Sequence, residues 1–385
     1  MIPYSKQIID KKDIRNVTKI LSSDFLTSGP ILKKFENKIK KYTKSKYSLC
    51  VNSATSALHI SCMALGLGKG DYFWTVPNSF ISTATSGLLC GSKVDFVDID
   101  YQTNNISIRS LKDKLFKAKK YNKLPKVIIP VHLTGNPCEM DKIYNLSKEY
   151  NFRIIEDASH AFGAKYKNNN IGSCKWSDIT VFSFHPVKIF TTAEGGSITT
   201  NNKKIYELAS LIRDNGIQRD SKKFMNISSK KWYYEHQILG YNYRMNEIQA
   251  GLGISQISKL NKFYNERNKI KKYYLNKLSI LSEKIILPTY LKNSKSSLHL
   301  FVIKIKKKYF NRDKLKIKLL NYGINTNVHY MPIHLQPYFK KLGFKKNQFP
   351  LSEKYGEEAL SLPIYPYLDK KTIDFIIKKI FKILK

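Results

Sequence analysis

Cysteine is scarce in this sequence. The 385 residues include five cysteines, which are widely spaced, odd in number and never arranged as CxxC: Cys50, Cys62, Cys90, Cys138 and Cys174. This pattern excludes a disulfide framework and argues against a zinc site. We therefore expect reduced, mostly packed thiols and no bound metal.

Long apolar runs are missing as well. No stretch approaches the ~18 apolar residues that a membrane-spanning helix needs. The opening MIPYSKQIID lacks the apolar stretch of a signal peptide. We therefore expect no membrane partner and a cytoplasmic location. Apolar residues still make up 42% of the chain, which is enough for a sizeable core.

Acidic residues are few, at 29 against 67 basic ones, and the formal net charge is +38. Such a charge can indicate binding to nucleic acid or to an anionic membrane surface. However, only eight of the basic residues are arginine, the lysines are scattered, and Asn, Ile and Tyr are abundant too. We interpret the excess as a compositional bias with lysines on solvated faces, and expect no nucleic-acid partner.

Short β-rich runs alternate with helical stretches from about residue 47 to 200. Seven such runs are present: YSLCVNS, YFWTVP, KVDFVDID, KVIIPVHL, FRIIED, ITVFSFH and GGSITTN. The alternation predicts an α/β fold with a mostly parallel, doubly wound sheet. Ligands of such sheets bind at the carboxyl ends of the strands. Two amphipathic helices, over 10–22 and 31–45, are expected before the first strand.

The remaining chain is expected to end in a smaller domain. Residues 216–240 are polar and aromatic and too long for a simple connection, so we expect a functional loop. A helical pattern follows over about 245–281, then the β-type runs HLFVIKI and INTNVHY and a Lys-rich helix from about 370. We predict an N-terminal arm and large domain over 1–255, and a smaller C-terminal α+β domain over 256–385.

One lysine stands out by its neighbours. Lys188 follows an aromatic strand end and precedes a Gly-Gly turn, in SFHPVKIFTTAEGG, while Asp157 closes the apolar run FRIIED. Such a pair can serve pyridoxal phosphate, because the lysine forms a Schiff base and the carboxylate keeps the pyridine nitrogen protonated. Partial burial would lower the pKa of Lys188 for attack on a carbonyl. A solvent-facing lysine and a capping aspartate are the alternatives.

The turn NSATSAL, over 52–58, is a candidate anion site. It follows an apolar run and opens a helical segment, so its free amides and the hydroxyls of Ser53, Thr55 and Ser56 could hold a phosphate. A simple helix cap is the alternative. Ser183 is well placed as a second phosphate donor.

Other aromatic and histidine positions remain open at this stage. Phe80 either covers a cofactor ring or packs in the core. His160, His185 and His329 do not share metal-ligand spacing, so a structural, hydrogen-bonded histidine is the default interpretation.

Taken in order, these motifs resemble a known family. The set NSATSAL, PNSFISTA, DASHAFGA, SFHPVK, EGG, LGYNYRMNEIQAGLG and NVHYMPIHLQPYF is similar to the DegT/DnrJ/EryC1/StrS sugar aminotransferases, over about residues 1–383. The resemblance implies the pyridoxal-phosphate-dependent transferase fold type I, which is aspartate aminotransferase-like. It also implies a homodimer with shared active sites.

The resemblance further implies the reaction. Glutamate is the expected amino donor, and a UDP-linked 4-keto-6-deoxy-N-acetylhexosamine is the expected acceptor, aminated at carbon 4. A different UDP- or dTDP-linked keto sugar is the alternative. A non-catalytic regulatory or nucleic-acid-binding protein of the same fold is the third possibility, against which the intact Lys188 and Asp157 pair argues.

Residue roles carry over by position. Lys188 matches the Schiff-base lysine, Asp157 its pyridinium partner, and His160 a position beside the cofactor's phenolic oxygen. The other positions that match cofactor-binding residues of the family are Ala54, Thr55, Phe80, Ser183 and Asn242. Of these, Asn242 is expected to reach the cofactor from the other subunit. The stretches expected to line the nucleotide-sugar site contain Tyr4, Leu26, Thr27, Ser28, Gly29, Asn327, Val328, His329 and Tyr330. Phe190 replaces a smaller aliphatic residue of the family and is expected to reshape the sugar pocket.

Overall fold

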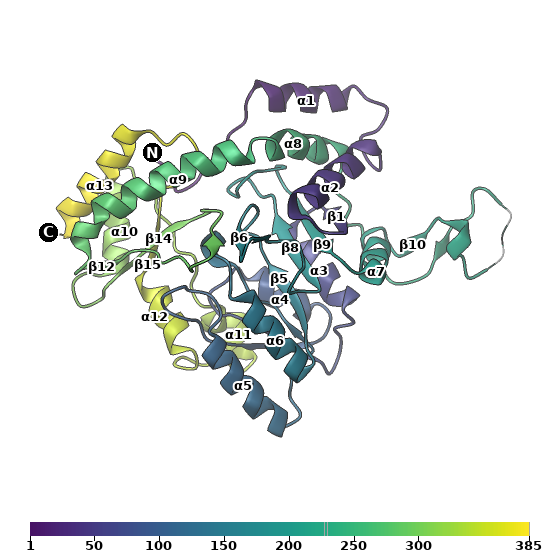
Figure 1. Ribbon diagram of the computed structural model, residues 1–385, viewed down its shortest axis with the longest axis horizontal. Coiled ribbons are helices and arrows are strands. Elements are labelled where there is room, and N and C mark those ends of the chain that lie inside the picture. Colours follow the sequence, from purple (N-terminus) through teal and green to yellow (C-terminus); the bar gives the residue numbers. More distant parts are fainter. Residues whose placement is uncertain (227, 229, 385) are drawn as a thin grey trace.

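The computed structural model describes residues 1–226, 228 and 230–384. Its centre is a seven-stranded sheet with the order β1-β9-β8-β5-β4-β2-β3 (Figure 1). The strands are β1 (Tyr47–Val51), β2 (Tyr72–Thr75), β3 (Lys93–Phe96), β4 (Val127–Ile128), β5 (Arg153–Asp157), β8 (Ile179–Ser183) and β9 (Gly196–Thr200). Each falls within one of the seven predicted runs. Only β9 runs opposite to the other six strands, so the predicted mostly parallel α/β sheet is confirmed.

Helices cover both faces of this sheet. Successive strand residues point to opposite faces, so Phe73 and Ile155 join one apolar cluster while Trp74 and Ile154 join another. The first cluster receives α3 (Ala54–Ala64), α4 (Ser82–Leu88) and α7 (Lys203–Arg213). The second receives α2 (Pro30–Thr43), α5 (Ile108–Lys120), α6 (Met140–Tyr150) and α8 (Glu247–Ile257). The amphipathic helix α1 (Lys11–Leu21) lies along α8 (Figure 1).

The C-terminal part has its own antiparallel sheet and apolar cluster. The sheet order is β12-β14-β15, and its strands are β12 (Ile285–Ile286), β14 (Phe301–Ile305) and β15 (Ala359–Leu362). The helices of this part are α9 (Leu260–Leu278), α10 (Arg312–Asn321), α11 (Pro337–Lys341), α12 (Pro350–Glu358) and α13 (Lys370–Leu384). The long helix α9 runs from α8 to this cluster (Figure 1).

The run over 324–330 differs from its prediction. It makes only isolated bridges, Ile324 with Ile2 and Asn327 with Ser361, and forms no strand. The backbone leaves the sheet there, which lets the side chains of 327–330 reach the pocket described below.

The stretch over 216–240 forms a ribbon that stands away from the body of the molecule (Figure 1). Its paired strands are β10 (Ile217–Gln218) and β11 (Glu235–His236), and residues 227 and 229 lie outside the described residues. The ribbon exposes large apolar side chains, among them Met225, Trp232 and Leu239. A further small sheet joins β6 (Lys165–Tyr166), β7 (Asn169–Asn170) and β13 (Ser294–Lys295).

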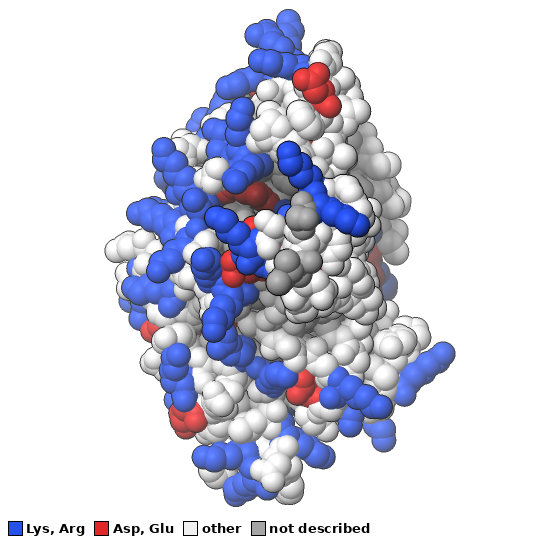
Figure 2. All heavy atoms as spheres, turned by 90° about the vertical axis from the view of Figure 1, so that its right-hand side faces the viewer, with Lys and Arg blue, Asp and Glu red and all other residues white. Residues whose placement is uncertain are grey.

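The excess of basic residues lies on the surface. Figure 2 shows lysine and arginine side chains spread over the face that carries the ribbon, with few acidic ones between them. Lys304 is the only fully buried lysine among the described residues. In the part of the chain that the structure describes, no helix combines the length and apolarity needed to span a bilayer.

Candidate active site

A pocket of ≈ 590 Å³ lies where β5 and β8 end and α3 begins. This is the edge of a doubly wound sheet at which ligands bind. The structure brings twelve of the predicted site residues to it: Tyr4, Ala54, Thr55, Phe80, Asp157, His160, Ser183, Lys188, Asn327, Val328, His329 and Tyr330.

Asp157 is the last residue of β5, and hydrogen bonds fix its buried carboxylate. Thr83 Oγ1 donates to Oδ2 at 2.6 Å, and the backbone N–H of Ser159 donates to Oδ1 at 3.1 Å. The Asp157 N–H donates to the carbonyl of Pro130 at 2.9 Å, which holds the strand end in place. The carboxylate therefore faces the pocket in a fixed orientation.

Lys188 lies in a loop between β8 and β9 that closes on itself. The N–H of Phe184 donates to the carbonyl of Gly195 at 2.8 Å, which joins the two ends of the loop. Burial lowers the pKa of Lys188 to about 8, although the nearby Asp157 carboxylate opposes this shift. Near neutral pH, Lys188 is therefore the free, nucleophilic amine far more often than an exposed lysine is.

The N-terminus of α3 forms the anion-binding part of the pocket. Ser53 caps the helix by accepting a hydrogen bond from the Ser56 N–H at 3.1 Å. The amides of Ala54 and Thr55 come before the first intrahelical bonds and can point at a ligand. Gly196 is needed beside them, because a Cβ there would lie 2.6 Å from the Ala54 nitrogen.

His160 is neutral, and its proton position is fixed. The Thr134 N–H donates to Nδ1 at 3.3 Å, so the ring proton is on Nε2, which lies 3.2 Å from Tyr330 Oη. Burial, followed by the charges of Lys188 and His329, lowers the pKa of His160 well below its usual value. His160 thus brings a single N–H donor to the pocket.

A chain of hydrogen bonds supports this histidine from α9. The fully buried Arg267 donates from Nη1 to the carbonyl of His299 at 3.2 Å. The His299 N–H donates to the carbonyl of Thr134 at 3.1 Å. The ring centroids of His299 and His160 are 4.3 Å apart. These contacts hold the Thr134 amide where it sets the tautomer of His160.

Residues 327–330 form another wall of the pocket. Asn327 Nδ2 donates to Nε2 of His329 at 3.3 Å, so the His329 Nδ1–H donates to Ser361 Oγ at 2.7 Å. Burial and then the charge of Lys188 lower the pKa of His329 to about 3. The ring of Tyr4 packs against His329, with centroids 5.3 Å apart.

The other predicted residues lie elsewhere in the single chain. Ser28 and Gly29 line a second pocket of ≈ 890 Å³ beside β10, and Leu26 and Thr27 precede them on the surface. Asn242 is exposed and pairs through its backbone with Asp214, which lines that second pocket. These five residues do not contact the pocket around Lys188.

Two phenylalanines are placed differently. Phe80 is 55% exposed on the pocket wall, with its ring centroid 6.1 Å from that of Tyr330. Phe190 is buried instead, with ring centroids 5.0 Å from Phe162 and 4.7 Å from Phe184. The expectation that Phe190 reshapes the sugar pocket is wrong, because its side chain fills the core and does not line this pocket.

Several side chains that support the site were not singled out from the sequence. Thr83 lies in the PNSFISTA motif, which was the available signal, whereas Thr134 and His299 carry no sequence signal. Glu194 was not singled out either, and it lines the pocket beside His185, which the sequence analysis named, with His185 Nε2 3.8 Å from Glu194 Oε1.

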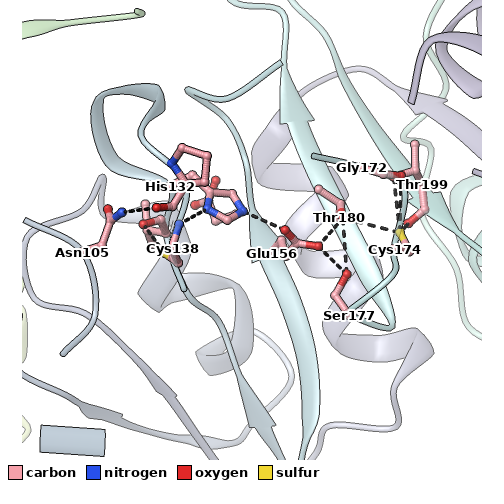
Figure 3. Close-up of polar contacts among 12 residues, drawn as sticks. Asn105, His132, Cys138, Glu156, Gly172, Cys174, Ser177, Thr180 and Thr199 are labelled. Atoms are coloured by element: carbon pink, nitrogen blue, oxygen red, sulfur yellow. Dashed lines mark hydrogen bonds and ion pairs between the residues drawn. The ribbon is translucent and has the colours of Figure 1, made fainter. Parts of the chain in front are cut away.

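A second buried network surrounds Glu156 of β5 (Figure 3). His132 Nε2 contacts Glu156 Oε2 at 2.8 Å, and Thr180 Oγ1 donates to Glu156 Oε1 at 2.9 Å. The Cys138 N–H donates to His132 Nδ1 at 3.0 Å. Successive strand residues face opposite sides of the sheet. The network around Glu156 therefore holds the end of β5 in place on the face opposite to the Asp157 side chain.

The donor set fits pyridoxal phosphate. One pocket holds an oriented carboxylate, a lysine whose charged form is disfavoured by burial, and a helix N-terminus flanked by hydroxyls. Among the described residues, no group of three or more His, Cys, Asp or Glu side chains is arranged to hold a metal ion. The fold and this site define a pyridoxal-phosphate-dependent transferase.

Comparison with known proteins agrees with that class. The model of the DegT/DnrJ/EryC1/StrS aminotransferase family matches residues 7–381, and the chain belongs to that family. A structural relative has been solved in its PLP-form. The chain is therefore a pyridoxal-phosphate-dependent nucleotide-sugar aminotransferase, and pyridoxal 5′-phosphate is its cofactor.

Individual relatives match along the whole chain. An uncharacterized protein of Methanocaldococcus jannaschii is 39% identical over 98% of this chain and 97% of its own length. The UDP-4-amino-4,6-dideoxy-N-acetyl-beta-L-altrosamine transaminase of Campylobacter jejuni is 35% identical over 100% of this chain and 98% of its own. The structure of Helicobacter pylori PseC, an aminotransferase of pseudaminic acid biosynthesis, superimposes with a TM-score of 0.90 at 29% identity, covering 100% and 99% of the chains.

Proposed function

We propose that this enzyme transfers the amino group of glutamate to carbon 4 of a UDP-linked 4-keto-6-deoxy-N-acetylhexosamine. The product is UDP-4-amino-4,6-dideoxy-N-acetyl-β-L-altrosamine, in the pathway to pseudaminic acid. The observation that carries the chemistry is the placement of Lys188 and Asp157 in one pocket. The Campylobacter transaminase and PseC support the choice of sugar.

Each pocket residue then has a role. Pyridoxal phosphate supplies an electron sink when bound. Lys188 Nζ would hold the cofactor, remove the proton from the α-carbon of the amino donor, and in the second half-reaction deliver a proton to carbon 4 of the sugar. Asp157 keeps a proton on the pyridine nitrogen. His160 would offer its Nε2–H, which lies 3.2 Å from Tyr330 Oη, to the phenolic oxygen.

The remaining pocket residues bind and orient. Ala54, Thr55 and Ser183 would bind the phosphate, and Phe80 would cover one face of the ring. Tyr4 and residues 327–330 line the space for the sugar nucleotide. The walls they form keep bulk water from the reacting carbon.

The site is completed by a second copy of the chain. Asn242 and Leu26, Thr27, Ser28 and Gly29 are remote from Lys188 within one chain. The exposed apolar side chains of the 217–239 ribbon offer a surface for a partner copy. We propose a homodimer in which these residues reach the partner's pocket, in a cytoplasmic enzyme with no nucleic-acid or membrane partner.

One assay tests the reaction. The purified enzyme is given the UDP-linked 4-keto-6-deoxy-N-acetyl sugar and glutamate, and the amino sugar is identified by NMR. We expect turnover by the native chain, loss of turnover in Lys188→Ala, and normal turnover in the exposed-lysine control Lys69→Ala. Full activity in Lys188→Ala would sink the assignment. Turnover only with a different UDP- or dTDP-linked keto sugar would keep the enzyme class and replace the substrate.

Mixing two inactive variants tests the shared site. Lys188→Ala lacks the reactive amine, and Asn242→Asp places a negative charge where the partner's phosphate is expected. If each site uses both chains, a mixed dimer contains one intact site, so mixing should restore part of the activity. Absence of any restoration after confirmed subunit exchange would place Asn242 outside the partner's site.

A further inference from the structure

The N-terminal arm, residues 2–8, has no regular secondary structure of its own, yet it is fixed at both of its ends. At one end, the Ile2 N–H donates to the carbonyl of Gly323 at 2.7 Å. At the other, Gln256 Nε2, on α8, donates to the carbonyl of Ile8 at 2.8 Å. The arm therefore has a defined path between the C-terminal part and α8.

Between these ends, Ser5 is bonded to the loop that carries Lys188. Ser5 Oγ donates to the carbonyl of Val187 at 3.1 Å, and Ser5 itself is buried. Val187 directly precedes Lys188, whose own N–H donates to the carbonyl of His185 at 2.9 Å. The Ser5 hydroxyl thus ties the backbone next to the reactive lysine to a segment that is distant in sequence.

The arm also packs closely against this loop. Only a small cavity of ≈ 10 Å³ lies between them, and its lining includes Lys6, Gln7 and Ile8 from the arm and Pro186, Lys188 and Ile189 from the loop. A space of that size holds about one water molecule. The arm therefore keeps most water away from the side of the loop that faces it.

The residue next to Ser5 belongs to the substrate pocket. Tyr4 lines the pocket around Lys188, and its ring packs against that of His329. Neighbouring arm residues therefore contact two different parts of the site. Tyr4 touches the wall expected to bind the sugar nucleotide, and Ser5 touches the loop of the lysine.

We propose that Ser5 is a positioning residue for the aminotransferase reaction, which acts through the Val187 carbonyl to hold Lys188 in place. A single amine that moves protons to and from carbon has to be fixed in direction as well as in distance. Without the hydroxyl, the Val187 carbonyl has to bond to water instead, which brings water beside Lys188. This inference rests on the role proposed for Lys188 and not on the choice of sugar.

The replacement of Ser5 by alanine leaves every charge around Lys188 unchanged. The charged or titratable groups that line the pocket with it are Tyr4, Asp157, His160, His185, Glu194, His329 and Tyr330, and those that line the small cavity with it are Lys6 and Arg267. A change in the titration of Lys188 in Ser5→Ala would therefore report its position and hydration.

The first test follows covalent capture of pyridoxal phosphate by the cofactor-free chain, which needs no sugar. In the native chain the rate should rise with pH through a midpoint near 8. In Ser5→Ala we expect a midpoint about half a pH unit higher, toward that of an exposed lysine, and a capture rate at pH 7 about threefold lower. An unchanged midpoint and rate would overturn the proposal.

Two further variants are matched to this one. Ser147 is equally buried, and its Oγ also donates to a backbone carbonyl, that of Tyr144 at 2.7 Å, but it lies on α6 and does not line the pocket. Ser147→Ala and the hydroxyl-preserving Ser5→Thr should both keep the native midpoint. An equal shift in either variant would indicate general loosening or altered packing and would reject the role of the Ser5 hydroxyl.

Steady-state kinetics of the cofactor-loaded enzyme then separate positioning from substrate binding. Ser5→Ala should lower kcat about fivefold and leave the KM for the keto sugar nearly unchanged. A raised KM with a native kcat would assign Ser5 to the substrate wall and overturn the proposal. If the native chain does not turn over the proposed sugar, the capture test still decides the role of Ser5. Capture that persists unchanged in Lys188→Ala would instead contradict the role of Lys188 itself.

Discussion

Lys188 and Asp157 share one pocket, but their surroundings differ. Burial removes hydration from the Lys188 ammonium and favours its neutral form. The Asp157 carboxylate is buried, yet both of its oxygens accept hydrogen bonds. The pocket therefore holds a nucleophile that is easily deprotonated beside a carboxylate whose position is fixed.

Lys188 should react with aldehydes at a lower pH than an exposed lysine. With its pKa at about 8, roughly a tenth of Lys188 is free amine at pH 7, against well under a hundredth for an ordinary lysine. The rate of covalent pyridoxal phosphate capture by the cofactor-free chain should rise with pH and level off above about 8. A midpoint near that of an unperturbed lysine would contradict the burial argument.

Thr83 should matter mainly through its hydrogen bond to Asp157, and its Oγ1 also lies 2.8 Å from Ser79 Oγ. Thr83→Val removes the hydrogen bond to Oδ2 while keeping the side-chain shape, and a bond to a charged group contributes roughly 1.5–3 kcal/mol. We expect pyridoxal phosphate affinity to fall about tenfold or more, measured by titration of the cofactor-free chain. Thr83→Ser keeps the hydroxyl and is the matched control. Equal loss in both variants would point to packing.

At the residue scale, the sequence predicted site residues best where they directly follow a strand. Lys188, Asp157 and the NSATSAL turn follow runs whose strand character is evident, so their meeting at one sheet edge was predictable. Thr134 and His299 come from segments far apart in sequence, and their approach depends on the packing of the C-terminal part. The sequence alone therefore could not predict that the Thr134 N–H fixes the tautomer of His160.

Among the elements, the N-terminus of α2 is stabilised by a side chain of α8, which is distant in sequence. Its N-cap is Gly29, which has no side chain to cap it, and its first turn contains no acidic residue. The buried carboxylate of Glu247 accepts hydrogen bonds from the N–H groups of Gly29, Ile31 and Leu32 at 3.0, 2.7 and 3.1 Å. α8 thus fixes the turn over 26–29 that we expect at the partner's site.

Glu247→Gln should destabilise the protein by about 2 kcal/mol, because a neutral amide loses the charge at the helix N-terminus and turns an N–H toward backbone donors. Urea unfolding measures the change in the free energy of unfolding. Glu149→Gln, at an exposed position, is the control and should stay within about 0.5 kcal/mol. Equal stability of the two variants would show that Glu247 is dispensable for α2.

Element prediction succeeded where pattern and packing agreed. The seven apolar runs became the seven strands because each is buried in the central sheet, where alternation and length suffice. The run over 324–330 has the same local pattern, yet only Asn327 and Ile324 make bridges. Its side chains serve the pocket, a role that local propensity does not encode. The division into domains near residue 255 stays a prediction.

For the whole molecule, a formal charge of +38 implies strong self-repulsion in the folded state. Salt screens exposed charges over about 10 Å at 0.1 M. The thermal midpoint should therefore rise by several degrees between low salt and about 0.3 M sodium chloride, measured by calorimetry on the cofactor-loaded enzyme. An unchanged or falling midpoint would mean that surface ion pairs outweigh the repulsion.

The antiparallel strand β9 constrains the order in which the nascent chain can acquire structure. In the central sheet β1 pairs only with β9. Because β1 ends at Val51 and β9 begins at Gly196, about 145 residues are synthesised before β1 finds its partner. At roughly 5–20 residues per second, that wait is on the order of 7–30 s.

The anion-binding turn directly follows β1 and packs against Gly196. A ribosome-arrested chain that exposes only residues before β9 should therefore fail to retain pyridoxal phosphate, whereas one arrested well beyond it should begin to do so. Cofactor capture then marks the moment at which translation has delivered the last strand of the sheet.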